Sequence, residues 1–369
     1  MLCNHSLSFL EESSSYGDDS VGRIWYCYPI WNKVSFTLVA KHHIKYLKNK
    51  FYVEEIDESA ISVLSPVTRP LLIVHPLFYV FCRFAKHLER RLYRYRGVLG
   101  IDVADSDHIS RLAVSITNYT DAVIVPSNFS RQAFIRSGVR VPVYVVPHGL
   151  EPEWFTLPPS KPNTFNDLWE LKTRRGYKLL LFFLWHSEYR KGADLVIHYY
   201  KELRKERKDV LLVVKTMSQE GKLQPIIRKL GGIIVSGWLT ETQKMELYDL
   251  ADIYPLFTRG GGFEINGLEA IARGLVVLAG KGGAWDDYLP EFSLLPSKTC
   301  PYVLKDNPIH DGKGVEVLID KAVDKTLHVL DNLDDYKARV KEHVEKFVKH
   351  RFTWAKVGEA LSEIIVKYL

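Results

Sequence analysis

Short, almost wholly apolar runs alternate with segments of helical periodicity along the first part of the chain. Runs that are apolar at successive positions are typical of strands buried on both faces of a parallel sheet with helical crossovers. One helical segment, 130–138, has Ser130 as its expected N-cap and Gly138 just past its end. The pattern therefore predicts an α/β domain, whose expected strands are 22–30, 70–75, 97–104, 121–127 and 141–149.

The alternation breaks once and then restarts, which predicts two domains. Prolines and a loss of periodicity mark 151–176 as a linker, and the alternation resumes from 177. A chain of 369 residues is also long for a single hydrophobic core. We expect doubly wound α/β domains over 1–150 and 177–345, facing each other across a cleft at the carboxyl ends of their strands. A mainly helical region, 315–369, closes the chain.

The composition, with 46% hydrophobic and 25% charged residues, is that of a soluble globular protein. A net charge of +6 suits an anionic ligand or an acidic membrane surface, but it is modest for this length and does not indicate nucleic acid. The N-terminus lacks a signal-peptide pattern, and the longest apolar run, 70–81, is shorter than the roughly 20 residues of a membrane span. Four scattered cysteines, Cys3, Cys27, Cys82 and Cys300, predict reduced thiols in a cytoplasmic protein.

The segment 81–97 predicts an amphipathic helix with a basic face. Its apolar stripe contains Phe81, Phe84, Ala85, Leu88, Leu92 and Tyr95. Its other face carries Arg83, Lys86, Arg90, Arg91 and Arg94. Two interpretations stay open, namely a solvated helix packed on the first domain and a basic surface that docks on an anionic membrane or an acidic acceptor.

A glycine-rich loop is the first candidate for function. Residues 258–275 read TRGGGFEINGLEAIARGL, in which a loop leads into a helix with Asn266 as the expected N-cap and Gly274 as the stop. Free backbone N–H groups at a helix start, together with the helix dipole, favour a bound phosphate. The glycines would let that phosphate approach the backbone closely.

Two carboxylates belong to the same stretch. Glu264 lies in the loop with no helix to cap, which favours a functional role. Glu269 falls at the third helical position after Asn266. It either forms a capping box with Asn266 or accepts hydrogen bonds from vicinal hydroxyls, as acidic residues do for ribose in nucleotide sites.

Four stretches together resemble the family 4 glycosyltransferases, which have the GT-B fold of two Rossmann-like domains. The stretch 237–289, GWLTETQKMELYDLADIYPLFTRGGGFEINGLEAIARGLVVLAGKGGAWDDYL, is similar to their nucleotide-sugar domain. The stretches 119–155, 183–203 and 351–368 are similar to the passage into the linker, the lysine–glycine segment and the closing helix. The resemblance implies that the second domain binds a nucleotide sugar, the first holds the acceptor, and a helix within 346–369 returns to the first domain.

The resemblance assigns the acids of the loop only in part. Glu269 matches the family acid that binds the ribose hydroxyls. The family acid that contacts the donor sugar aligns with Gly261, whereas Glu264 takes the place of a family glycine. Either Glu264 reaches the donor sugar from a slightly different backbone position, which makes it the candidate for the catalytic contact, or donor recognition differs from that of the family.

The cations that would hold the donor diphosphate come from the segment 183–203. Lys191 matches the family lysine that grips the diphosphate. The family arginine aligns with Trp185, so Arg190 is the expected second cation. The other residues expected against the diphosphate are Gly261, Gly262 and Phe263.

The resemblance places the nucleotide base beside Lys215, Gly237 and Trp238. Asp102 takes the position where the family often has a histidine near the reacting carbon, and Asp105, Asp107 and His108 follow it. Asp102 would bind an acceptor hydroxyl or act as a base, and the alternative is a helix cap or surface acid. His75 and His148 are expected to be structural.

The resemblance implies a hexosyltransferase that moves a sugar from a UDP- or GDP-linked donor to an acceptor hydroxyl, with retention of configuration. The acceptor would be a glycan, a lipid-linked molecule or a small molecule. We expect no cofactor beyond the nucleotide sugar, no nucleic-acid partner and, because no His/Cys/Asp cluster is evident, no protein-bound metal. Sugar phosphorolysis, nucleotide-sugar epimerisation and a catalytically weak accessory protein stay open as alternatives.

Overall fold

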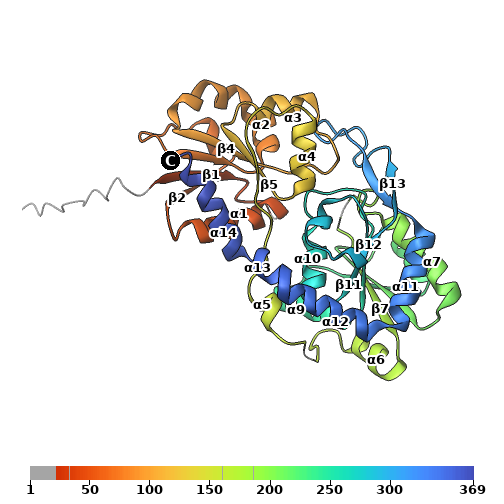
Figure 1. Cartoon of the computed structure of the whole chain (residues 1–369). Helices are drawn as coiled ribbons and strands as arrows, with labels where there is room; N and C mark the ends of the chain where they lie inside the picture. The colour runs from red at the N-terminus through yellow and green to blue at the C-terminus, as the bar shows by residue number, and fades with distance from the viewer. Residues whose placement is uncertain (1–21, 33, 160, 186) are drawn as a thin grey trace, which may run out of the picture.

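The computed structural model describes residues 22–32, 34–159, 161–185 and 187–369, which form two lobes (Figure 1). Cys3 lies outside the described residues. Each lobe contains a six-stranded parallel sheet with its own hydrophobic core. The predicted class of two doubly wound α/β domains is therefore confirmed.

The first sheet has the strand order β2-β1-β3-β4-β5-β6. Strands such as β3 (Leu71–Val74) and β5 (Ala122–Val125) are buried at every position, because helices cover both faces of the sheet. The other strands are β1 (Arg23–Tyr28), β2 (Tyr52–Asp57), β4 (Gly97–Ile101) and β6 (Val143–Val145). The main helices are α1 (Ser35–Leu47), α2 (Leu77–Leu88), α3 (Arg111–Thr117) and α4 (Asn128–Arg136).

The second sheet has the order β12-β11-β10-β7-β8-β9, so the direction of winding reverses between β7 and β10. Its strands are β7 (Lys178–Phe183), β8 (Val210–Thr216), β9 (Ile233–Ser236), β10 (Ile253–Leu256), β11 (Val276–Gly280) and β12 (Leu294–Leu295). The connecting helices are α7 (Ala193–Glu206), α8 (Gln224–Lys229), α9 (Glu241–Leu250) and α10 (Ile265–Ala272). Ligands of open α/β sheets bind at such a reversal, beyond the carboxyl ends of the strands.

The chain crosses between the lobes twice (Figure 1). The first crossing, between β6 and β7, contains α5 (Glu153–Thr156) and α6 (Asn166–Arg175). After α11 (Ile319–Asp331), the helices α12 (Leu333–His343), η5 (Val344–Val348) and α13 (Lys349–Arg351) lead back to the first lobe. There α14 (Trp354–Val366) buries Trp354, Leu361 and Ile365 in the first hydrophobic core. The predicted return of a C-terminal helix to the first domain is confirmed.

One strand was missed, and two local predictions were wrong. The edge strand β2 was not expected, because YVEEID carries three acidic residues on a strand that is only half buried. The region predicted as helical from 315 begins with β14 (Gly314–Val317), which pairs with β13 (Ser297–Cys300) in a separate antiparallel arm. Ser127 rather than Ser130 caps α4, since the Ser127 side chain accepts a hydrogen bond from the Ser130 amide.

The basic segment 81–97 is divided rather than one helix. Helix α2 ends at Leu88, and a 3₁₀ turn over Glu89–Arg94 leads to β4. Phe81 is buried, as expected, and Arg83 pairs with Glu58 at 2.7 Å. The side chains of 85–91, including Ala85, Lys86, Leu88, Arg90 and Arg91, lie outside those that the structure describes.

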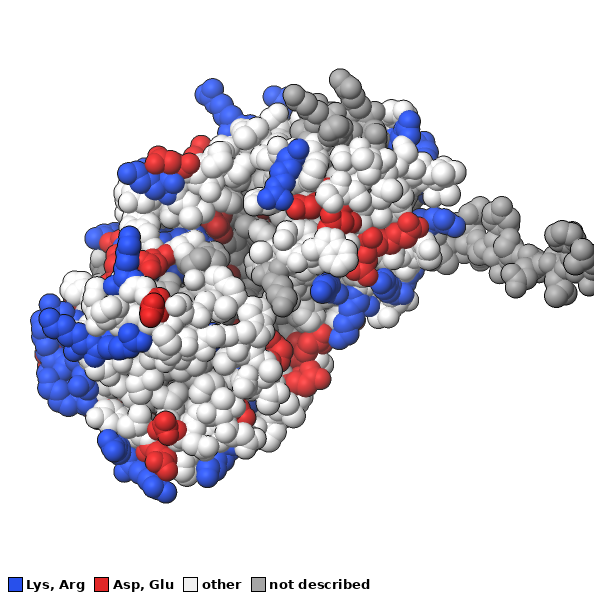
Figure 2. Space-filling model, turned by 180° about the vertical axis from the view of Figure 1, so that it is seen from behind, with Lys and Arg blue, Asp and Glu red and all other residues white. Residues whose placement is uncertain are grey.

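Charge is distributed over both lobes. Basic and acidic side chains are interspersed on the face in Figure 2, with one group of Lys and Arg at the edge of the second lobe. Within the described part of the chain, no helix has the length and apolar character needed to cross a membrane.

Candidate functional site

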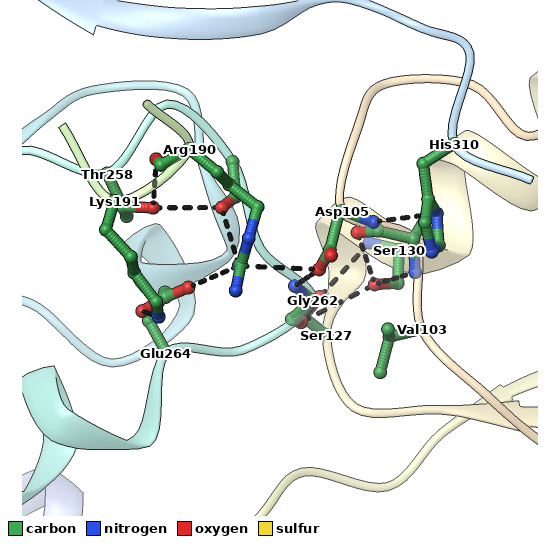
Figure 3. Close-up of polar contacts among 12 residues, drawn as sticks. Val103, Asp105, Ser127, Ser130, Arg190, Lys191, Thr258, Gly262, Glu264 and His310 are labelled. Atoms are coloured by element: carbon green, nitrogen blue, oxygen red, sulfur yellow. Dashed lines mark hydrogen bonds and ion pairs between the residues drawn. The ribbon is translucent and has the colours of Figure 1, made fainter. Parts of the chain in front are cut away.

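Two loops meet where the winding of the second sheet reverses, one after β7 and one after β10. The first carries Arg190 and Lys191, and the second carries the three glycines and Glu264. Backbone hydrogen bonds join the loops, including one from the Arg259 amide to the Arg190 carbonyl at 2.7 Å. The sequence therefore brings its expected cations and its loop carboxylate to one place, which Figure 3 shows.

Glu264 binds both cations. One carboxylate oxygen lies 3.1 Å from Nη1 of Arg190, and the other lies 2.5 Å from Nζ of Lys191. The carboxylate is almost fully buried, and burial lowers the pKa of Lys191 even though Glu264 opposes that effect. In this structure the cations expected to hold a diphosphate are thus both paired with one carboxylate of the protein itself.

The backbone at Glu264 is unusual and explains how its side chain reaches this position. Glu264 has a φ of 61°, a left-handed conformation that is uncommon outside glycine, and it is the N-cap residue of α10. Its carboxylate fills the space that a side chain at Gly261 would enter. Glu264 thus places an acid next to the position where the resembling family has one. The prediction of Asn266 as N-cap was wrong, because α10 begins at Ile265.

Glu269 is buried on α10 and has three polar partners. Its oxygens lie 2.7 Å from Nζ of Lys244, 2.8 Å from the hydroxyl of Tyr248 and 3.1 Å from the side-chain amide of Asn266. The contact with Asn266 therefore joins two side chains, whereas a capping box would use the Asn266 backbone amide. Lys244 and Tyr248 were not found by sequence reasoning, because they are placed by α9.

Arg259 anchors the glycine loop to neighbouring elements, and sequence reasoning did not identify it. Its guanidinium forms two contacts of 2.7 Å with Asp194 and one of 2.8 Å with Glu316, and it lies over the Tyr189 ring. The loop is thereby tied to α7 and to β14. The partners are distant in sequence and carry no local motif, so this anchor could be found only in the folded chain.

The glycines of the loop serve contacts within the protein. A side chain at Gly260 would collide with the Asp105 carbonyl, and one at Gly262 would collide with Val103. The Gly262 amide donates to Asp105 at 3.1 Å, and its carbonyl accepts from Ser127 at 2.7 Å. The Gly262 backbone thus joins the two lobes through these hydrogen bonds (Figure 3), whereas the sequence predicted that it would contact a phosphate.

Two acids of the first lobe lie at this junction and differ in environment. Asp102 accepts hydrogen bonds from the amides of Phe78 and Val103, at 2.7 and 2.8 Å, and burial raises its pKa to about 7. This is a helix-cap arrangement at the start of α2. Burial would also raise the pKa of Asp105, but Arg190, 3.8 Å away, and neighbouring cationic groups lower it. Asp105 is therefore the first-lobe acid that faces the cations.

Of the residues expected at the base, Lys215 lies at the carboxyl end of β8, and Gly237 and Trp238 directly follow β9. The buried Lys215 ammonium donates to the carbonyls of Thr216 and Gly237, at 2.9 and 2.5 Å. Trp238 is exposed and meets Trp185, the residue aligned with the family arginine, at a ring distance of 5.5 Å. Phe263 instead packs in the core beside His148, with ring centres 4.9 Å apart.

Buried histidines lie at the other reversal of winding, between β1 and β3 of the first sheet. The Tyr26 hydroxyl lies 2.9 Å from Nδ1 of His43 and 3.0 Å from Nδ1 of His75. Burial lowers the pKa of His43 well below its usual value and that of His75 to about 3. Both histidines are thus neutral in the folded protein. Within the described ranges, no group of three or more His, Cys, Asp or Glu side chains is placed to hold a metal.

Because His43 and His75 are buried in the neutral form, we expect the folded protein to lose stability in acid. Unfolded histidine has a pKa of about 6.5, so below that pH the unfolded chain binds more protons and stability falls. Between pH 7 and pH 5 each of His43 and His75 should cost about 2 kcal/mol. Asp102, whose folded pKa is raised, should offset about 2 kcal/mol in the same interval, so the histidines prevail. Urea unfolding at both pH values tests this.

A matched pair of variants tests whether the buried His75 causes part of this loss of stability. His75→Gln should reduce the loss of unfolding free energy between pH 7 and pH 5, while His350→Gln, at an exposed position, should leave it unchanged. An unaltered loss in His75→Gln would contradict the assignment.

Comparison with known proteins agrees with this architecture. Residues 170–293 match the domain model described as Glycosyl transferases group 1. The structure of HepE from Anabaena in complex with UDP and glucose superposes with a TM-score of 0.69 at 14% identity, covering 94% of this chain and all of that one. The chain thus has the GT-B fold, and its second lobe contains a domain similar to the group 1 glycosyl transferases.

Two curated viral proteins are related in sequence. "Putative glycosyltransferase 45" of Sulfolobus islandicus filamentous virus (isolate Iceland/Hveragerdi) is 32% identical over 194 residues, which are 51% of this chain and 50% of that protein. "Uncharacterized protein 356" of Sulfolobus islandicus rod-shaped virus 1 is 37% identical over 357 residues, covering 94% of this chain and 98% of that protein. The chain belongs to the same family as protein 356.

Proposed function

We propose that this protein is a retaining hexosyltransferase, akin to family 4, that moves a sugar from a UDP- or GDP-linked donor to an acceptor hydroxyl. The observation that carries the proposal is the pair of adjacent cations, Arg190 and Lys191, facing Glu264 where the second sheet reverses its winding. Two neighbouring cations beside a helix start suit a diphosphate. HepE, which shares the fold, was crystallised with UDP and glucose.

Each residue of the site has a role in this proposal. Arg190, Lys191 and the first turn of α10 bind the diphosphate, and Glu269 accepts hydrogen bonds from the ribose. The diphosphate replaces Glu264 on the cations, and the released carboxylate turns to the sugar. Asp102 positions α2, because both of its oxygens are used by backbone amides. Gly262 serves in closure of the lobes.

The reaction needs no covalent nucleophile from the chain. The bond between the anomeric carbon and the phosphate oxygen breaks, and the acceptor oxygen bonds to the same carbon on the same face. The acceptor proton passes to the departing phosphate. The two cations stabilise the charge that develops on the diphosphate, so no metal or further cofactor has a part in the proposal. Contact between the lobes would keep water from the donor.

The acceptor is proposed only as a class: a hydroxyl of a glycan, a lipid-linked molecule or a small molecule. A cytoplasmic enzyme whose segment 81–97 touches an anionic membrane would suit a lipid-linked acceptor. That contact stays a prediction.

The test is a screen of UDP- and GDP-linked sugars for thermal stabilisation, followed by an assay for release of the free nucleoside diphosphate. A ligand that binds only the folded state raises the melting temperature. At a ligand concentration of one hundred times Kd, the free energy of unfolding increases by about 2.7 kcal/mol. We expect stabilisation by at least one donor and acceptor-dependent release. Binding without turnover across a broad acceptor panel would favour the accessory-protein alternative, and turnover that requires inorganic phosphate would indicate phosphorolysis.

A further inference from the structure

The antiparallel arm of the second lobe touches the first lobe at its tip. The arm is rooted in the second lobe, where the Val315 amide of β14 donates to the Arg259 carbonyl at 2.9 Å. Residues 308–313, the arm tip, precede β14 and lie against residues 105–110 of the first lobe. Figure 1 shows the arm rising from the second lobe toward α3 and α4. A segment of one lobe thus reaches the loop between β4 and α3 of the other.

Backbone groups hold the arm tip on the first lobe. The Asp107 amide donates to the Lys313 carbonyl at 2.9 Å, and the Lys313 amide donates to the Asp107 carboxylate at 2.7 Å. Ser110 donates twice, from its amide to the Ile309 carbonyl at 2.8 Å and from its hydroxyl to the Pro308 carbonyl at 2.6 Å. These hydrogen bonds form a seam between the lobes, and all of them must break before the tip can leave the first lobe.

Gly312 shows how closely the two segments approach each other. Its amide donates to the Ser106 hydroxyl at 3.2 Å. A side chain at this position would place its Cβ atom 2.5 Å from a carboxylate oxygen of Asp107 and 2.6 Å from the backbone nitrogen of His108, distances at which atoms overlap. Gly312 is not among the glycines with a positive φ, so glycine is needed here for space against the first lobe rather than for the conformation of the arm. Alanine in its place is therefore compatible with the arm itself but not with the docked tip.

His310 links the seam to the cation pair. Its Nδ1 accepts a hydrogen bond from the Asp105 amide at 3.3 Å, and burial lowers the pKa of His310, which favours the neutral imidazole that this bond requires. The Asp105 carboxylate in turn lies 3.8 Å from Nη1 of Arg190 and accepts a hydrogen bond from the Gly262 amide at 3.1 Å. The arm tip and the glycine loop therefore hold Asp105 from two sides (Figure 3).

We propose that the arm tip is a latch that keeps the two lobes together, and that it must leave residues 105–110 before the lobes can separate. In Figure 1 the arm and the two chain crossings, at α5 and α13, lie on opposite sides of the contact between the lobes. Lobes that turn about such connecting segments separate most on the side away from them. A seam on that side therefore resists opening most effectively. Because the seam is made by groups of the chain alone, it forms without a bound nucleotide.

Small-angle X-ray scattering and amide hydrogen exchange of the full chain, both without nucleotide, test the latch. In the wild type, peptides that cover residues 105–110 should be protected from exchange. Gly312→Ala should increase the radius of gyration and speed exchange in these peptides by about tenfold or more, the scale of one or two lost hydrogen bonds. Peptides from β4 and β5 should keep their protection. Lys305→Ala, an exposed change between β13 and the tip, is the matched control and should behave like the wild type.

Several results would overturn the latch. Rapid exchange over residues 105–110 in the wild type would mean that the seam does not form in solution. An unchanged radius of gyration in Gly312→Ala, with or without faster exchange, would mean that the tip does not hold the lobes together. Loss of protection throughout the first lobe of the variant would assign the arm to the folding of that lobe. None of these measurements involves a nucleotide, so the latch and the proposed function can fail separately.

Discussion

Glu264→Gln is expected to lower turnover by about 10²- to 10³-fold, the scale of one preorganised electrostatic contact at a reacting centre. The carboxylate is the acid that the glycine loop places beside the cations, 3.1 Å from Arg190 and 2.5 Å from Lys191. Glutamine keeps the length and shape of the side chain but removes the charge that would stabilise a cationic sugar in the transition state. The change should therefore act on catalysis more than on binding.

The same substitution should leave UDP binding unchanged or make it tighter. In the structure Glu264 is paired with both cations, so a diphosphate that binds them must displace it. Glutamine holds the cations less strongly, and that competition is reduced. Loss of a buried charge that pairs two cations should also lower the melting temperature, since unpaired buried charges are costly. UDP should then raise the melting temperature of the variant more than that of the wild type.

Initial rates and calorimetric Kd values measured on the same preparations separate the two effects. Glu188→Gln, an exposed change in the loop after β7, is the matched control and should leave both quantities unaltered. Parallel losses of turnover and UDP affinity in Glu264→Gln would assign Glu264 to the structure of the loop.

The periodicity of the chain predicted the architecture, and its failures were local. Apolar runs such as Leu71–Val74 are buried on both faces whatever covers them, so they identify parallel strands from sequence alone. The acidic edge strand Tyr52–Asp57 and the arm strand Gly314–Val317 lack such runs and were missed. The two N-caps were misplaced by two and three residues because a cap depends on backbone conformation, as the left-handed Glu264 shows.

The site was predictable as residue types and not as contacts. Adjacent cations and a glycine-rich loop could be read from the sequence, and the structure brings them together. Gly262 contacts Val103 and Asp105, and Arg259 reaches Asp194 and Glu316; these contacts join residues 57 to 159 positions apart in the chain. Pairs of this kind leave no local pattern and are defined only by packing.

Lys191→Ala is expected to weaken UDP binding by about 1.5–3 kcal/mol, the worth of a hydrogen bond to a charged group, which is roughly 10- to 150-fold in Kd. Lys281→Ala is the matched control, because it removes the same charge from a surface pair with Glu291 and should leave the Kd unchanged. An unaltered Kd in Lys191→Ala would remove Lys191 from the donor site.

The effect of Lys191→Ala should be larger when Glu264 is already glutamine. In the wild-type background the substitution removes the contact between Lys191 and the phosphate, which weakens binding. It also removes the ion pair between Lys191 and Glu264, which the donor would otherwise have to break. In the Glu264→Gln background that ion pair is already absent, so Lys191→Ala should show the full loss of donor affinity. Residues in direct contact typically show coupling of about 0.5–3 kcal/mol in a double-mutant cycle. Calorimetry on the four proteins measures this coupling. Changes that add to within about 0.5 kcal/mol would mean that Glu264 and the diphosphate do not compete for Lys191.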